Sequence, residues 1–274
     1  MQARNFDLAL YQERIGYTGV VQPDIATVSQ WMHLQLCSVP FENLDVQARK
    51  GVSLVPEDIV EKILYQGCGG YCYEVNGLFA MALTAIGVPW HFVAARPMFY
   101  PERRPKTHMA VVAQLDGESW LCDLGFGSYG LRRPFPLSQM DTELRQDDDV
   151  FKLSRLPNGE LLLQALSEGQ WTRQYSFDLT PWEWVDFAPA NHLNSTHPQA
   201  IFVRQLLVIL QTSKGRKILS GNTLKLIEAA TSDKRTLAED ELPDILRDEF
   251  KLDARRLASS TGMPTTPVKQ PSRD

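Results

Sequence analysis

A β-hairpin is encoded by residues 107–127, which read THMAVVAQLDGESWLCDLGFG. Apolar residues lie on both sides of Asp116-Gly117, a dipeptide typical of the tight turn in a hairpin. Pairing Leu115 with Glu118 across this turn aligns the two strands in antiparallel register. Further short apolar runs, separated by turn residues, occur at His91–Ala95, Val150–Leu156, Leu161–Leu166 and Trp171–Leu179. Residues 88–185 are therefore predicted to form a small antiparallel barrel or a packed antiparallel sheet.

The hairpin also brings two polar residues, His108 and Asp123, onto one face of the sheet. In the register just given, His108 stands opposite Gly125, and Asp123 is its diagonal neighbour. Diagonal neighbours lie about 7–8 Å apart at the backbone, within reach of a side-chain hydrogen bond. A slip of one residue would put the two side chains on opposite faces, so the pairing depends on this register.

Helices are predicted on the N-terminal side of the hairpin, where apolar residues repeat every three to four positions. The predicted helices cover Phe6–Tyr11, Ile25–Leu36, Pro56–Leu64 and Cys72–Ile86, so residues 1–87 are predicted to be helical. Residues 186–256 are mixed, with a hairpin around the Lys214-Gly215 turn and a helix at Leu242–Phe250. Residues 257–274 are rich in Pro, Ser and Thr and are predicted to be a flexible tail.

Cys72 follows the glycine pair Gly69-Gly70 and stands at the predicted start of a helix. The unpaired N–H groups and positive end of a helix favour a thiolate over a thiol, and the same N–H groups suit a developing oxyanion. Glycine allows positive φ and lets another molecule approach closely. Taken alone, Cys72 fits a buried structural cysteine equally well. Together with His108 and Asp123 it forms the nucleophile, base and orienting carboxylate of cysteine acyl-transfer enzymes.

The composition is that of an ordinary folded protein, with 274 residues, 43% hydrophobic residues and a net charge of −5. The negative charge gives no electrostatic reason to expect a nucleic-acid or membrane partner. The longest central run without charge or proline, Asn76–Val88, is shorter than the roughly 18–20 residues that span a bilayer. We therefore expect a cytoplasmic protein with reduced thiols. Only Cys68 and Cys72 have metal-like spacing and no second pair follows, so no metal site is expected.

Three blocks of the sequence resemble the catalytic blocks of the arylamine N-acetyltransferases. They are Gly69–Asn76, Thr107–Met109 and Asp123–Gly127. Supporting blocks agree at Tyr11–Tyr17, Val39–Asp45, Asn194–Pro198 and Gly215-Arg216, so the resemblance covers roughly residues 6–252 in order. It implies an α+β, multi-domain protein with a cysteine-protease-like catalytic core. The implied domains are a helical bundle at 1–87, an antiparallel β-barrel at 88–185 and an α/β lid at 186–256, followed by the tail.

The same resemblance implies a reaction and its residues. Acetyl-CoA, a co-substrate rather than a permanently bound cofactor, would acetylate Cys72 of a Cys72/His108/Asp123 triad, and an arylamine or arylhydrazine would accept the acetyl group. O-acetylation of arylhydroxylamines is a related activity. Phe126 and Gly127 would lie beside the thioester, with Thr196 and Gly215 on the coenzyme side. An amide synthase of the same fold, acting in natural-product biosynthesis, is the alternative function. Monomer and homo-oligomer both remain open.

One position departs from the family pattern. The family usually carries arginine immediately before the glycine pair, where this chain has Cys68. Cysteine cannot replace the charge or the fixed hydrogen bonds of a guanidinium, so the rigidity of the loop before Cys72 comes into question. Two roles are open for Cys68: an apolar filler, or a thiol that forms a reversible disulfide with oxidised Cys72.

Overall fold

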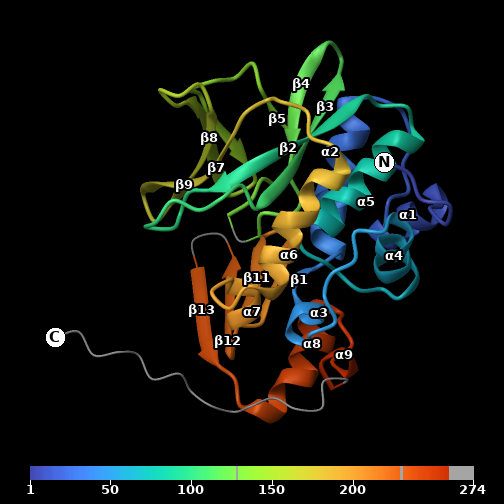
Figure 1. Ribbon diagram of the computed structural model, residues 1–274, viewed down its shortest axis with the longest axis vertical. Coiled ribbons are helices and arrows are strands. Elements are labelled where there is room, and N and C mark those ends of the chain that lie inside the picture. Colours follow the sequence, from blue (N-terminus) through green and yellow to red (C-terminus); the bar gives the residue numbers. More distant parts are fainter. Residues whose placement is uncertain (128, 229–230, 259–274) are drawn as a thin grey trace.

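Helices and two antiparallel sheets make up the computed structural model, which describes residues 1–127, 129–228 and 231–258 (Figure 1). The helices are α1 (Leu8–Ile15), α2 (Ile25–Ser38), α3 (Leu44–Gln47), α4 (Pro56–Val60), α5 (Cys72–Ala85), α6 (Ala188–Thr196), α7 (Ile201–Arg204), α8 (Leu242–Phe250) and α9 (Arg255–Ala258). A π-helical turn at Glu61–Tyr65 continues α4, and 3-10 turns at Trp184–Phe187 and Glu239–Glu241 precede α6 and α8.

The larger sheet has, in the described part of the chain, eight strands in the order β5-β4-β3-β2-β9-β8-β7-β6. They are β2 (Trp90–Pro97), β3 (His108–Leu115), β4 (Glu118–Cys122), β5 (Phe135–Pro136), β6 (Glu143–Gln146), β7 (Asp149–Arg155), β8 (Leu161–Ser167) and β9 (Gln170–Phe177). β3 and β4 pair with Leu115 opposite Glu118, which confirms the predicted hairpin and its register. The predicted barrel is wrong in its closure. The sheet curls, but its outer strands β5 and β6 do not pair, so it is a half-barrel.

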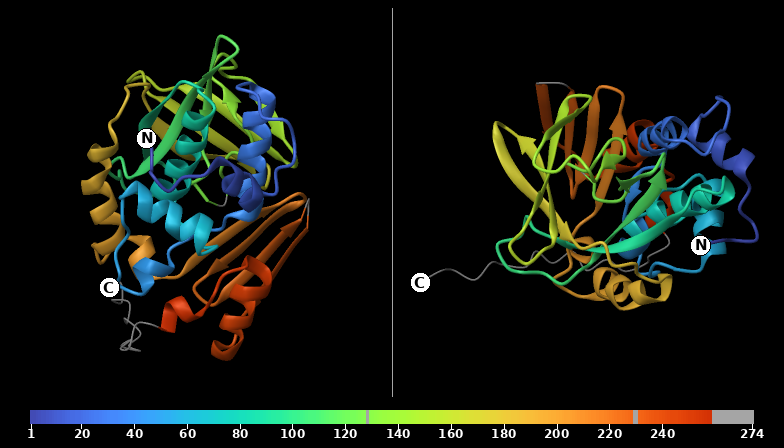
Figure 2. Two further views of the ribbon diagram at one scale, coloured as in Figure 1. Left: turned by 90° about the vertical axis from the view of Figure 1, so that its right-hand side faces the viewer. Right: turned by 90° about the horizontal axis from the view of Figure 1, so that it is seen from above.

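Helix α5 lies against the half-barrel and is buried from Cys72 through Leu83. A helix that is apolar on every side has to be covered all round. Strand β3 packs on one side of α5, and α1 and α4 pack on others (Figures 1 and 2). One continuous core therefore runs from the N-terminal helices into the sheet. The predicted domain boundaries at 87 and 185 remain a prediction.

The smaller sheet has, among the described residues, five strands in the order β1-β10-β11-β12-β13. They are β1 (Phe41–Glu42), β10 (Leu207–Thr212), β11 (Gly215–Ser220), β12 (Thr223–Glu228) and β13 (Thr231–Thr236). Alternation along β10 puts Val208 and Leu210 into a second core with Phe250 of α8, while Ile209 joins the main core. The sequence predicted the β10–β11 hairpin but missed β1, because a strand of two residues is too short to show an alternation of apolar and polar residues.

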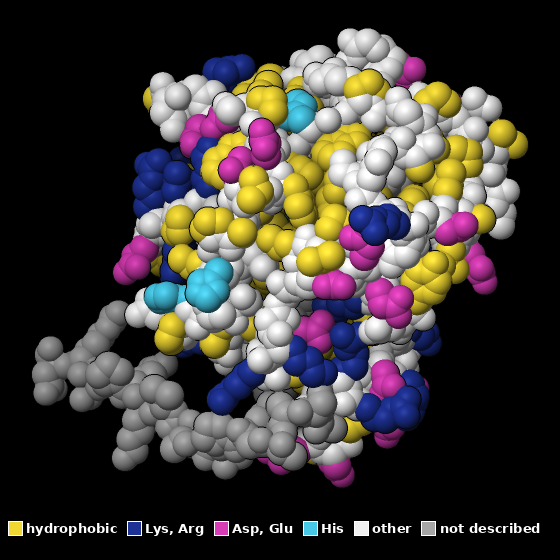
Figure 3. Space-filling view, turned by 45° about the vertical axis from the view of Figure 1, so that its right-hand side comes forward, with side chains coloured by type: hydrophobic (Ala, Val, Ile, Leu, Met, Phe, Trp, Pro, Cys, Tyr) yellow, Lys and Arg dark blue, Asp and Glu magenta, His cyan; other side chains and the backbone are white. Residues whose placement is uncertain are grey.

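The C-terminal end of the described chain returns to the N-terminal part, where α9 contacts α3 (Figure 1). Residues 257 and 258 belong to α9, whereas the remainder of the predicted tail, 259–274, lies outside the described residues. No helix in the described ranges is long and apolar enough to cross a membrane. On the face seen in Figure 3, acidic and basic side chains lie interspersed rather than in one basic band.

Candidate active site

The helix that carries Cys72 begins where the sequence predicted it. Tyr71 is the N-cap of α5, and its N–H donates to the Glu74 carboxylate at 2.9 Å. Gly69 and Gly70 are needed for close approach within the chain: a Cβ on Gly69 would clash with the Pro40 carbonyl oxygen, and one on Gly70 would lie 2.6 Å from the Glu74 Cβ. The expectation that these glycines use positive φ is therefore wrong, while their allowing close approach of another molecule stays a prediction.

His108 and Asp123 form a buried hydrogen-bonded pair, as the hairpin register predicted. His108 Nε2 lies 2.8 Å from Asp123 Oδ2, and the two residues are 4% and 1% exposed. Burial alone would raise the pKa of Asp123, but His108 and hydrogen bonds from Gly125 and Asn76 outweigh it and hold that pKa below its usual value. An ionised carboxylate only accepts hydrogen bonds, so Nε2 is the donor. The lone pair of the neutral ring is then on Nδ1.

Asn76 fixes the carboxylate from the other side, a role that the sequence analysis missed. Its amide nitrogen donates to Asp123 Oδ1 at 3.2 Å and to the Met109 carbonyl at 2.7 Å, and its oxygen accepts from Leu124 N–H at 2.8 Å. Asn76 follows Cys72 by one helical turn, so both side chains lie on the same face of α5. That spacing was the available signal.

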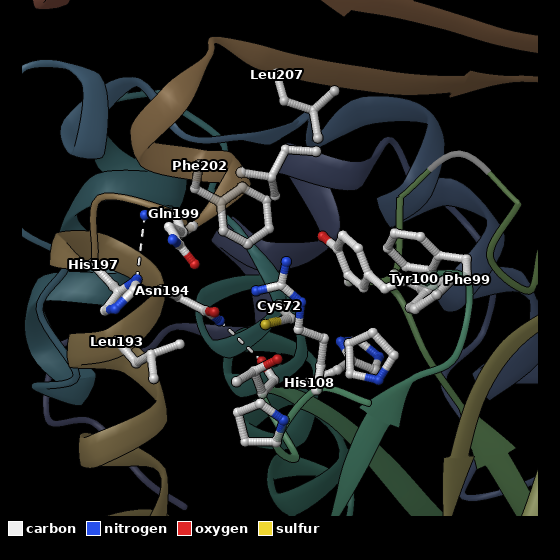
Figure 4. Close-up of a pocket in the computed structure, with 18 of the residues that line it drawn as sticks. Cys72, Phe99, Tyr100, His108, Leu193, Asn194, His197, Gln199, Phe202 and Leu207 are labelled. Atoms are coloured by element: carbon white, nitrogen blue, oxygen red, sulfur yellow. Dashed lines mark hydrogen bonds between the residues drawn. The ribbon is translucent and has the colours of Figure 1, made fainter. Parts of the chain in front are cut away.

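The end of the hairpin lies directly against Cys72. A Cβ on Gly125 would lie 2.8 Å from the Cys72 Cβ, so only glycine permits this approach. Cys72 and His108 line one pocket with Phe126 and with residues from α6 and α7 (Figure 4). The Phe126 ring meets the His108 ring edge-on, with 5.1 Å between centroids.

The Cys72 thiol is not ionised by its position alone. Burial raises the pKa of Cys72 above its ordinary value and the Asp123 charge raises it further, while hydrogen bonds from the backbone of Met109 and Tyr73 lower it less. The prediction that the helix start by itself favours thiolate is therefore wrong, because desolvation of a charge outweighs the helix end. Removal of the proton from Cys72 therefore needs a base or a counter-charge that the helix start does not supply.

The other predicted site residues lie in different places. Phe126 lines the pocket, and the Gly127 carbonyl accepts from Gln211 at 3.4 Å. Thr196 ends α6 and donates to the His192 carbonyl; its neighbours Asn194 and His197 line the pocket, but Thr196 does not. Gly215 lines a separate hollow beside Arg132.

The loop before Cys72 has Cys68 at the position where the family usually has arginine. Two other arginines, Arg14 and Arg256, hold this loop instead. The Arg14 guanidinium donates to the carbonyls of Gly67 and Cys68 at 3.3 and 3.2 Å. Arg256, in α9, contacts the buried Cys68 sulfur and donates to the Asp45 carboxylate at 3.0 and 3.2 Å. The free Cys68 thiol thus lies against a guanidinium that reaches it from the far end of the chain.

Lys62 completes this polar cluster beneath the loop. Its Nζ lies 2.7 Å from Glu74, 2.8 Å from Asp45 and 3.3 Å from Glu42. Burial would lower the pKa of Lys62, but the three carboxylates outweigh it and raise that pKa. Because Glu74 also caps α5, the cluster ties the start of α5 to β1 and α3.

We expect Arg256→Ala to destabilise the protein by about 1–3 kcal/mol, less than the loss for a fully buried pair because its side chain is 20% exposed. The adjacent Arg255→Ala is the control: that side chain is 90% exposed and pairs with Asp253, so its loss should leave the melting temperature unchanged. Adding Cys68→Arg to Arg256→Ala should restore stability by returning a guanidinium to the same place. Equal melting temperatures for the two single variants would contradict this account.

No three His, Cys, Asp or Glu side chains among the described residues are grouped so that they could hold a metal ion.

A family model described as N-acetyltransferase matches residues 24–258, which include Cys72, His108 and Asp123. The match covers most of the chain and both sheets. The class of protein is therefore N-acetyltransferase.

Relatives of known name are arylamine N-acetyltransferases. Arylamine N-acetyltransferase 2 of Mus musculus is 28% identical over 276 residues, covering 91% of this chain and 95% of its own length. The arylamine N-acetyltransferase of Escherichia coli K12 is 30% identical over 216 residues, covering 77% of this chain and 75% of its own length. The chain belongs to the arylamine N-acetyltransferase family.

Solved structures agree over nearly the whole chain. The arylamine N-acetyltransferase of M. tuberculosis has a TM-score of 0.89 at 28% identity, covering 93% of this chain and 98% of its own. That of Mycobacterium marinum, solved in complex with CoA, has a TM-score of 0.86 at 26% identity, covering 93% and 95%.

Proposed function

We propose that this protein transfers an acetyl group from acetyl-CoA to an arylamine or arylhydrazine through an acetyl-Cys72 intermediate. The observation that carries the proposal is the buried His108–Asp123 pair, whose His108 lines the same pocket as Cys72 at the start of α5. The family supports the same reaction. CoA as the donor is supported by the structural neighbour from M. marinum, which was solved with CoA.

In the first half-reaction, the Cys72 thiol passes its proton to His108 Nδ1, and the sulfur attacks the carbonyl carbon of acetyl-CoA. The carbon–sulfur bond to the coenzyme then breaks, CoA takes the proton back from His108, and acetyl-Cys72 remains. Burial raises the pKa of Cys72 in the folded protein, so a base is needed to take its proton. Asp123 stabilises the imidazolium that forms and holds Nδ1 as the base.

In the second half-reaction, the amine nitrogen attacks the acetyl carbon of acetyl-Cys72. His108 takes the proton from the amine and returns it to the departing Cys72 sulfur, so the thiol is regenerated. The N–H groups of Cys72 and Tyr73 open α5, and the Tyr73 N–H already faces the Cys72 sulfur, so we assign these two groups to the oxyanion in both steps. We assign Phe126 and Gly127 to the thioester, and Thr196 and Gly215 to the coenzyme side.

Initial rates should give parallel lines when the acceptor concentration is varied at several acetyl-CoA concentrations, because CoA leaves before the amine binds. Release of CoA without any acceptor, followed as a burst, tests the first half-reaction separately. Intersecting lines together with no burst would contradict the covalent mechanism.

O-acetylation of arylhydroxylamines belongs to the same proposal, since a hydroxyl oxygen can attack acetyl-Cys72 as the amine does. A Salmonella typhimurium relative, 31% identical over 192 residues, carries N-hydroxyarylamine O-acetyltransferase in its name. The amide-synthase alternative uses the same three residues, and a panel of acceptors distinguishes it.

A further inference from the structure

Arg104 lines the same pocket as Cys72 and His108, and the reaction proposed above gives it no task. It lies in the connection between β2 and β3, four residues before His108. Its guanidinium carbon lies 4.7 Å from the centre of the Tyr100 ring, a stacked cation–π contact. The Arg104 carbonyl accepts a hydrogen bond from Arg96, so the backbone of the connection is also held.

The Arg104 guanidinium has no anionic partner among the described residues. Its Nε is buried and makes no hydrogen bond. No Asp or Glu is among the described residues that line the pocket. Among the residues that the structure describes, the two buried arginines, Arg132 and Arg216, are each paired with an aspartate, whereas the partly buried Arg104 lines a pocket that has none. A buried donor without a partner costs free energy, and a guanidinium that lines a pocket without a carboxylate is suited to a ligand that brings an anion.

The surroundings of Arg104 suit a flat aromatic ligand. Phe99 and Tyr100 precede it on the same connection, Phe126 lines the same pocket, and Figure 4 shows Phe99 and Tyr100 beside Cys72 and His108. The Phe99 and Phe126 rings meet edge-on at 5.8 Å between centroids. Apolar walls strengthen a charge-assisted hydrogen bond, and a guanidinium binds a carboxylate through two parallel bonds.

We propose that Arg104 selects arylamine acceptors that carry a carboxylate, with the aminobenzoates as the simplest members. The carboxylate pairs with the guanidinium, the ring lies among the aromatic side chains, and the amino group faces acetyl-Cys72. This inference rests on the proposed function. CoA also carries anions, its phosphates, but these are separated from the thioester by the whole pantetheine arm. In the proposed mechanism CoA also leaves before the acceptor binds, so the acceptor is the source of the anion that pairs with Arg104.

The test compares each aminobenzoate isomer with its uncharged amide, which keeps the ring and the amine. With the best isomer, Arg104→Gln should lower kcat/KM for the aminobenzoate by about 10–100-fold, the value of a charge-assisted bond, and change that for the aminobenzamide by less than about threefold. Arg103→Gln is the matched control, since this exposed neighbour does not line the pocket. The burst of CoA from acetyl-CoA should be the same in all three proteins.

Two results would overturn the inference alone. One is an equal loss for acid and amide in Arg104→Gln, and the other is a slower CoA burst in that variant, which would assign Arg104 to the donor. Absence of the burst from the wild-type protein would instead overturn the proposed function, so the two failures are distinguishable.

Discussion

Replacement of Cys72 by alanine is expected to reduce acetyl transfer by about 10⁶-fold, the size of loss that follows removal of a covalent nucleophile. The sulfur is the atom that carries the acetyl group in the proposed mechanism, and no other thiol lines the pocket among the described residues. Intact-mass measurement after mixing with acetyl-CoA, without acceptor, checks this directly. The wild-type protein should gain the mass of one acetyl group, and Cys72→Ala should gain none.

Cys37→Ser is the matched control for that experiment. Cys37 is a partly buried free thiol outside the pocket, so its loss should leave both the acetyl adduct and the turnover unchanged. An acetyl adduct on Cys72→Ala, or a turnover near that of wild type, would contradict the assignment of the nucleophile.

Asp123→Asn is expected to leave a folded protein whose kcat is lower by about 10⁴-fold. The amide nitrogen of asparagine would donate to His108 Nε2, which places the proton of the neutral ring on Nδ1, where the base is needed. The amide also cannot stabilise the imidazolium. Initial rates and the CoA burst should fall together, because His108 acts in both half-reactions.

An unchanged circular-dichroism spectrum and melting profile would show that Asp123→Asn is folded, since Asp123 also accepts from Asn76 and Gly125. Retention of near-normal rates would remove Asp123 from the mechanism. Asn76→Ala offers an intermediate case: it loses one hydrogen bond to the carboxylate and should lower the rate by less than Asp123→Asn does.

Local patterns predicted the centre of the site because its parts lie close together in sequence. The Asp116-Gly117 turn determined the register of β3 and β4, and with it the pairing of His108 and Asp123. The glycine pair marked the start of α5 at Cys72. The resemblance to the family then joined these two pieces, which no local pattern could do.

Contacts between distant parts of the chain were not predictable in the same way. Strand β1 pairs with β10, where Phe41 lies opposite Ile209, more than 160 residues later in the chain. The open edge of the half-barrel depends on how strongly the sheet curls, which strand propensity does not encode. The raised pKa of Cys72 depends on burial by β3 and Gly125, so reasoning from the helix start alone gave the wrong direction.

The contact of Arg256 with Cys68 and Asp45 has a consequence for biosynthesis. A ribosome synthesises the chain from its N-terminus, so Cys72 emerges long before Arg256 does, and domains fold as they are completed. Until α9 has left the ribosome, the loop before Cys72 lacks one of its two guanidinium partners, and Asp45 relies on Lys62 alone. The loop before Cys72 thus acquires its final contacts only after residue 256 has been made, more than 180 residues after Cys72 itself.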